Sequence, residues 1–158
     1  MPAAQQGDTF IIVERTNPHD PQATALLQAS HALMQSLFPP EDNAYLSIDE
    51  LCGADVHFFA ARRGTILRGT GALAVKDGYG EIKSMFVDPY ARGQGVADAI
   101  LRTLEDLAHE TGLDEMKLET GNTLRAAHKL YERHGFVLCS PFGDYTANAS
   151  SIFMKKQL

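Results

Sequence analysis

The sequence predicts a single α/β domain, residues 1–158, built on a mixed, mostly antiparallel sheet of about seven strands with helices on both faces. Three observations carry this prediction. The chain has 158 residues, 44% apolar and 22% charged, which suits one globular domain with one core. Apolar segments of strand length alternate with segments of helical periodicity. Turns rich in Gly and Pro separate these segments, in the order β-α-α-β-β-β-α-β-α-β-β.

The N-terminal part of the chain predicts one strand, one long helix and one short helix. The apolar run at residues 10–14 fits a first strand. The turn at residues 17–21 places proline at a helix start, and apolar residues then recur at helical spacing until residues 38–40, Phe-Pro-Pro, end the helix. Ser47 and Glu50 have the spacing of a capping box, which predicts a short second helix directly after them.

The rest of the chain predicts a meander, two helices and three further strands. Apolar segments at residues 56–62, 70–75 and 81–87 are separated by turn residues and fit antiparallel strands. The clearest helix runs from residue 97 to Gly112, with its apolar side chains on one face. The last elements are a strand at 116–120, a helix at 124–134 closed by Gly135, and strands at 136–139 and 152–156.

Composition argues against several classes of function. The net charge of −6 and the lack of a Lys/Arg cluster oppose nucleic acid as a partner. No apolar run reaches the roughly 18 residues of a membrane span, and residues 1–9 lack the features of a signal peptide, so we expect a cytoplasmic protein with no membrane partner. Cys52 and Cys139 are expected to be free thiols. The histidines show no paired spacing, so no metal site is expected.

The junction between the strand at 81–87 and the next helix has the features of an anion site. Gly93 and Gly95 let the backbone approach a ligand closely, and the helix after them points free N–H groups and a positive dipole end at that space. Arg92 adds a full positive charge. The spacing matches neither a P-loop nor a dinucleotide-binding fingerprint, which opposes a nucleotide-binding α/β protein. On the glycines alone, an ordinary helix-capping turn would be the simpler explanation.

Two sequence blocks together resemble a known family. Arg92, Gly95 and Ala97 match the pattern R/Q-x-x-G-x-G/A, and residues 127–136 match A-x-x-L-Y-x-x-x-G-F. The chain therefore resembles the GNAT (Gcn5-related N-acetyltransferase) superfamily, whose fourth strand would correspond to residues 81–89. The strand order predicted from the residues agrees with that fold over nearly the whole chain.

The resemblance implies acetyl-CoA as co-substrate, held where the fourth and fifth strands splay apart. The pantetheine arm would pair with the backbone of Met85, Phe86 and Val87. The pyrophosphate would meet the backbone N–H groups of Arg92, Gly93, Gln94, Gly95, Val96 and Ala97. Asn122 stands where relatives contact the pantetheine arm, although its loop also fits a helix cap.

The same resemblance indicates candidate catalytic residues. An alkylammonium, with a pKa near ~10.4, must lose a proton before it attacks a thioester, and the leaving thiolate, with a pKa of about 8.5, gains from a proton donor. Tyr131 matches the tyrosine that many relatives place beside the sulfur and is the candidate acid; packing against the sheet is its alternative role. Glu81 is the candidate base, and an ion pair with Lys83 is the alternative. Strand alternation predicts that Glu81, Lys83 and Met85 share one face.

Lys83 and Glu119 are candidate contacts for the acceptor, with ordinary surface charge as the alternative for both. Lys83 would hold the carboxylate of an amino acid-like acceptor. Glu119 is expected close to Tyr131. Residues 38–45 would form a lid over the acceptor, and the acidic pair within them favours a cationic acceptor instead. An amphoteric acceptor would satisfy both features.

We therefore predict an acetyl-CoA-dependent N-acetyltransferase. Its acceptor would be a primary amine of a small molecule or a peptide, attacking directly in a ternary complex. The alternative is a catalytically silent acyl-CoA-binding module with a sensor or assembly role; the presence of both Glu81 and Tyr131 favours the enzyme. The resemblance also implies a homodimer.

Overall fold

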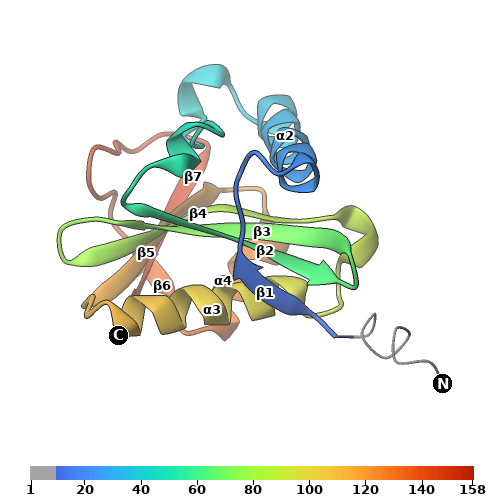
Figure 1. The fold of residues 1–158 in the computed structure, drawn as a ribbon. Helices are drawn as coiled ribbons and strands as arrows, with labels where there is room; N and C mark the ends of the chain where they lie inside the picture. The colour runs from blue at the N-terminus through green and yellow to red at the C-terminus, as the bar shows by residue number, and fades with distance from the viewer. Residues whose placement is uncertain (1–9) are drawn as a thin grey trace.

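A seven-stranded sheet forms the centre of the molecule, with helices on both faces (Figure 1). The computed structural model describes residues 10–158, so the segment 1–9 considered above for a signal peptide lies outside the described residues. In spatial order the strands are β1 (Ile12–Arg15), β2 (Val56–Arg63), β3 (Ile66–Val75), β4 (Tyr79–Val87), β5 (Glu115–Gly121), β7 (Ser151–Gln157) and β6 (Val137–Cys139). All neighbours pair antiparallel except β4 and β5, which are parallel. The mixed, mostly antiparallel sheet is therefore confirmed.

Within residues 10–158, three α-helices cover the sheet, one on one face and two on the other (Figure 1). Helix α2 (Pro21–Leu37) packs with η2 (Glu50–Cys52) in a small cluster over β2 and β3. Helices α3 (Val96–Glu110) and α4 (Arg125–Arg133) pack in the larger cluster on the opposite face. Two further single turns of 3₁₀ helix are η1 (Pro40–Asp42) and η3 (Pro89–Ala91).

The helix ends follow from local chemistry. The Asp20 side chain accepts hydrogen bonds from the backbone N–H groups of Gln22 and Ala23, with Pro21 at the first helical position of α2. Helix α2 stops at Phe38, because the two prolines that follow cannot extend it. Thus the predicted boundaries of this helix are confirmed.

The predicted second helix is only a single 3₁₀ turn. The capping box does form: Ser47 N–H donates to Glu50 Oε1 over 2.9 Å, and Glu50 N–H donates to Ser47 Oγ over 3.1 Å. The 3₁₀ turn ends at Gly53, and a short turn at Ala54 and Asp55 then leads into β2. The capping signal was correct, and the chain has no room after it for a longer helix.

Strands β4 and β5 pair over only part of their length. Their register joins Tyr79–Ile82 to Glu115–Leu118, and beyond Ile82 the edge of β4 that faces β5 has no strand partner. Backbone groups at such a free edge can bond to a ligand instead. The splay of these two strands, which was implied by resemblance, is therefore present.

A bulge in β4 changes the faces of its residues. Ala72 lies opposite Lys83 and Thr70 opposite Phe86, so two residues, Ser84 and Met85, oppose Gly71 alone. Ser84 has a φ of 55°, a left-handed conformation. The sulfur of Met85 lies beside Gly71 on the α3 face. The prediction that Met85 shares a face with Glu81 and Lys83 is wrong, because the bulge inserts one residue into the alternation.

Two further findings concern the described residues. Within residues 10–158, no helix has both the length and the apolar character needed to cross a bilayer. The same residues contain no cluster of three or more His, Cys, Asp or Glu side chains suited to a metal ion.

Candidate active site

The gap between β4 and β5 opens into a cleft of about 870 Å³, called here the large cleft. Its walls come from the end of β4, the start of α3, helix α4 and the inner side of α2. The predicted cofactor-binding residues that line it are Met85, Phe86, Val87, Arg92, Gly93, Gly95, Val96 and Ala97. Segments distant in sequence therefore meet at one cleft.

Two predicted cofactor-binding side chains lie outside the lining of this cleft. Gln94 accepts a 2.6 Å hydrogen bond from Arg63 and donates to the Tyr90 carbonyl, so its amide faces the turn. Asn122 donates to the Ala149 carbonyl over 2.8 Å, which ties its loop to the segment before β7. The structure therefore does not place these two side chains at the cleft with the other predicted cofactor-binding residues.

The glycine loop presents backbone donors to the large cleft. Gly93 and Gly95 have φ values of 73° and 85°, which residues with a side chain adopt only with strain. Gly95 is the N-cap of the 15-residue helix α3 and supplies no side-chain cap, so the first N–H groups of the helix remain available. Together with Arg92, these groups could hold an anion such as a pyrophosphate.

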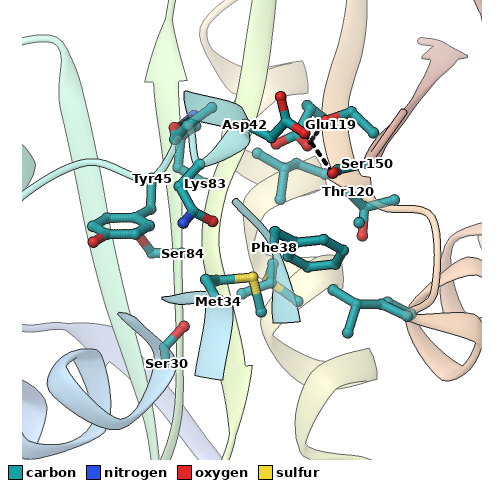
Figure 2. A pocket seen from close by; sticks show the side chains of 18 of the residues that line it. Ser30, Met34, Phe38, Asp42, Tyr45, Lys83, Ser84, Glu119, Thr120 and Ser150 are labelled. Carbon is teal, nitrogen blue, oxygen red and sulfur yellow. Dashed lines mark hydrogen bonds between the residues drawn. The ribbon is translucent and has the colours of Figure 1, made fainter. Parts of the chain in front are cut away.

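A second cavity, of about 130 Å³, adjoins the large cleft and is called here the small cavity. Met34, Met85 and Tyr131 line both spaces, so the two meet at these side chains. Figure 2 shows the small cavity between β4, β5 and the segment after α2. Its charged lining residues are Asp42, Lys83 and Glu119.

Tyr131 stands at the junction of the two spaces. Its side chain is 5% exposed and contacts Phe136 edge to face, with 5.7 Å between the ring centroids. Burial, and to a lesser extent the charge of Glu119, raises the pKa of the Tyr131 phenol well above its usual range. Among residues 10–158, no group forms a hydrogen bond with its hydroxyl, which leaves the phenolic proton free for a ligand.

Glu119 lies on β5 and faces the small cavity. Ser151 Oγ donates to Glu119 Oε2 over 2.7 Å, and no cation within the described chain forms an ion pair with this carboxylate. Burial is the main reason that the pKa of Glu119 is raised; the hydrogen bond from Ser151 and the charge of Lys83 act in the opposite direction. A half-buried carboxyl group with a raised pKa is suited to proton transfer.

Glu81 and Lys83 belong to a buried hydrogen-bonded network. Glu81 is 5% exposed, and its Oε2 accepts from the Tyr145 hydroxyl at 2.5 Å and from Lys83 Nζ at 3.3 Å. Lys83 Nζ also donates to the Tyr145 hydroxyl and to the Ala44 carbonyl, each over 2.8 Å. Lys83 lines the small cavity, whereas Glu81 does not. The structure thus separates Glu81 from the cavity that contains Glu119.

Tyr145 and Ser150 are site residues that sequence reasoning missed. Both lie in the segment between β6 and β7, which has no helical or strand periodicity. Ser150 Oγ donates to Asp42 Oδ2 over 2.6 Å, joining this segment to η1 (Figure 2). No local motif marks these residues, because their role depends on segments distant in sequence.

Comparisons with known proteins agree with this geometry. The family model described as "Acetyltransferase (GNAT) family" matches residues 23–136. An IAA acetyltransferase of Azospirillum brasilense is 35% identical, with 94% of this chain and 98% of the relative covered. A crystal structure of a Klebsiella pneumoniae protein assigned to the acyl-CoA N-acyltransferases has a TM-score of 0.79 and 30% identity, covering 95% of this chain and 99% of that one.

A third likeness is to a more distant structure. The PaiA N-acetyltransferase of Thermoplasma acidophilum, crystallised in complex with coenzyme A, has a TM-score of 0.74 over 94% of this chain and 99% of its own. At 14% identity this likeness shows the fold alone.

The splayed sheet, the glycine loop and the two joined cavities suit an acyl-CoA-dependent transferase. The chain belongs to the GNAT acetyltransferase family and is an acetyl-CoA-dependent N-acetyltransferase.

Proposed function

We propose that the protein transfers the acetyl group of acetyl-CoA to a small primary amine by direct attack in a ternary complex. The observation that carries this proposal is the junction of the large cleft and the small cavity at Tyr131. A ligand in each space would meet at this side chain. Holding two reactants in contact supplies much of the acceleration of such a reaction.

Acetyl-CoA fits the large cleft. The unpaired edge of β4 offers backbone groups to the pantetheine amides, and the N–H groups at the start of α3 face the position suited to the pyrophosphate. A Cβ placed on Gly93 or Gly95 would meet no atom within 4 Å, so this part of the loop borders open space. Arg92 and Arg125 add positive charge to the lining.

The base in this proposal is Glu119, directly or through one water. It lines the small cavity, its pKa is raised, and its carboxylate accepts only one hydrogen bond from the described residues. Glu81, the base favoured by sequence, has its Oε2 bonded to Tyr145 and Lys83 and is not part of the cavity lining. We therefore assign Glu81 a role in holding Lys83 and Tyr145 in place.

The proton balance follows from these positions. Glu119 takes one proton from the bound ammonium, and the free amine attacks the thioester carbonyl to form the new C–N bond. As the tetrahedral adduct collapses, the C–S bond breaks, and the second proton lost by the nitrogen ends on the departing thiolate to give the free CoA thiol. Tyr131 donates a hydrogen bond to the departing sulfur. Because the pKa of Tyr131 is raised, the phenol stays protonated at every physiological pH, and its contribution is stabilisation of developing negative charge more than complete proton transfer.

Release of the free CoA thiol from acetyl-CoA tests this proposal. The wild-type chain, Tyr131→Phe and Glu119→Gln are compared against pools of amines, with acetyl-CoA binding measured by calorimetry. We expect amine-dependent release that falls by about 10²–10⁴-fold in Glu119→Gln, the usual contribution of a general base. Binding of acetyl-CoA without release in any pool would contradict the proposal and support the silent binding module.

A homodimer, implied by the resemblance, stays a prediction. Light scattering coupled to size-exclusion chromatography measures the mass directly, and a monomer mass would contradict it.

A further inference from the structure

The small cavity offers no free cationic group to an acceptor. Among the described residues that line it, Lys83 is the one cation. An ammonium has three N–H donors, and those of Lys83 point to the Ala44 carbonyl, the Tyr145 hydroxyl and the Glu81 carboxylate. A substrate carboxylate would find no unused donor on Lys83. The cavity therefore does not favour an amino acid-like acceptor.

The cavity does offer two carboxylates with spare acceptor capacity. Asp42 accepts from Ser150 Oγ and Glu119 accepts from Ser151 Oγ, at 2.6 and 2.7 Å (Figure 2 shows the first contact). Neither carboxylate forms an ion pair within residues 10–158, and each has about four lone-pair sites. The charge of Lys83 is offset by that of Glu81, so the two remaining negative charges set the sign of the field in the cavity.

Ser150 and Ser151 each hold one of the two carboxylates of the cavity. Ser150 and Ser151 are consecutive, so a single stretch of chain holds Asp42 at one place and Glu119 at another. Glu119 is the carboxylate near Tyr131, whose pKa its charge raises. Asp42 comes from η1, on the lid side of the cavity. A ligand whose reacting nitrogen lies at Glu119 therefore shares its cavity with a second carboxylate, Asp42.

The lining of the small cavity is part polar and part apolar. Met34, Phe38 and Leu124 contribute to the lining, and the Phe38 ring packs closely over Gly121. The volume of about 130 Å³ is well below the roughly 300–1,000 Å³ of sites for drug-sized ligands. The space suits a short alkyl chain better than a sugar ring or a nucleoside.

From these observations we infer that the acceptor is a short aliphatic diamine, whose reacting nitrogen lies at Glu119 and whose second ammonium pairs with Asp42. This inference rests on the proposed function and specifies its substrate class. The apolar residues of the lining contact the methylene groups, and the second ammonium donates to the free oxygen sites of Asp42.

Three amines of equal chain length test the inference with the full chain and acetyl-CoA. Putrescine, n-butylamine and γ-aminobutyrate share the reacting end and carry ammonium, methyl and carboxylate at the far end. We expect kcat/KM for putrescine to exceed that for butylamine by about tenfold or more, as for one charged hydrogen bond. γ-Aminobutyrate should be the poorest, because its carboxylate would face Asp42. A rate with γ-aminobutyrate equal to or above that with butylamine would overturn the inference.

Asp42→Asn gives the second arm of the test. The putrescine-to-butylamine ratio of kcat/KM should fall towards one, and γ-aminobutyrate should improve relative to butylamine. Glu41→Gln is the matched control, because Glu41 is an exposed neighbouring acid that does not line the cavity, and it should keep the wild-type ratio. Thermal melts of both variants report whether they are folded. A full putrescine preference in folded Asp42→Asn would overturn the inference.

Failure of the inference can be distinguished from failure of the proposed function. Acetyl transfer to some other pool of amines, with none to putrescine, overturns only the inference that the acceptor is a diamine. Acetyl-CoA binding with no transfer to any amine overturns the proposed function, and therefore also the inference that the acceptor is a diamine.

Discussion

The Tyr145 hydroxyl donates a hydrogen bond of 2.5 Å to the Glu81 carboxylate, across 64 residues of sequence. The same hydroxyl accepts from Lys83, whose ammonium also holds the Ala44 carbonyl. One buried network thus ties the segment after α2 and the segment before β7 to strand β4. Both segments contribute lining residues to the small cavity, so the network helps to fix the shape of that cavity.

Tyr145→Phe should therefore lower both stability and acceptor binding. Glu81 keeps only the Lys83 contact, and a buried carboxylate that loses a hydrogen bond costs about 1–3 kcal/mol. For a chain of this size we expect the Tm to fall by roughly 2–10 °C, and the KM for the amine to rise more than the KM for acetyl-CoA. Differential scanning calorimetry and steady-state kinetics measure these changes.

Tyr90→Phe is the control for this prediction. Tyr90 is 91% exposed, so loss of its hydroxyl should leave the Tm unchanged. A wild-type Tm in Tyr145→Phe would show that the network contributes nothing to the stability of the fold.

Much of the fold could be predicted from the sequence, because local patterns determine it. The apolar face of α3 and the turn residues between strands gave the order of elements, and the spacing of Gly93 and Gly95 predicted a glycine turn before this helix. These signals act within a few residues of sequence. Side chains that face the large cleft from α2 were not expected, because helical periodicity does not say which face meets a ligand.

The remainder of the site depends on contacts that sequence patterns do not encode. The bulge at Ser84 reverses the face of Met85, and no residue type in β4 signals it. Tyr145 reaches Glu81 only because the segment between β6 and β7 folds back over β4. The choice between Glu81 and Glu119 as base likewise depends on burial and on hydrogen-bond partners, which become visible only in three dimensions.

Glu119→Gln should stabilise the fold at neutral pH while it reduces activity. A carboxyl group whose pKa is raised on folding holds its proton more tightly in the folded chain. Wild-type stability therefore falls as the pH rises from the ordinary glutamate value, about 4.3, through the raised value. Glutamine carries no charge and can still accept from Ser151.

We therefore expect the Tm of Glu119→Gln to exceed that of the wild type at pH 7, with a difference that closes below about pH 4. Thermal melts across this range measure the difference. Glu110→Gln, at an exposed position, should show no such pH dependence. A Tm below wild type at neutral pH would contradict the argument.

Asp98→Asn should have the opposite dependence on pH. The Asp98 carboxylate accepts hydrogen bonds from His134, over 2.8 Å, and from Arg133, which connect the end of α4 to the start of α3. These contacts lower the pKa of Asp98, and the one from His134 contributes most. A carboxylate with a depressed pKa stabilises the fold above its unfolded value, about 3.9, and loses this effect as the pH falls through the folded value. The Tm of Asp98→Asn should lie several degrees below that of the wild type at pH 7, and the difference between the two Tm values should narrow below about pH 4.

Exposed Asp106 on the same helix provides the comparison for Asp98. Asp106→Asn should match wild type at every pH, because its carboxylate forms no ion pair within the described residues. A constant Tm gap for Asp98→Asn across pH would mean that packing, and not charge, holds the two helices together.

Gly95 and Gly112 allow backbone strain to be separated from ligand binding. Both have positive φ, 85° and 74°, and a methyl group at either would meet no atom within 4 Å. Alanine at each position should therefore cost a similar free energy of unfolding, about 1–2 kcal/mol. Gly95 lines the large cleft, whereas Gly112 lies beyond the C-terminus of α3. Only Gly95→Ala should weaken acetyl-CoA binding, by about tenfold if the loss is near 1.4 kcal/mol. Calorimetric titration with acetyl-CoA measures both Kd values, and equal weakening in the two variants would show that the loss comes from general destabilisation and not from the glycine loop.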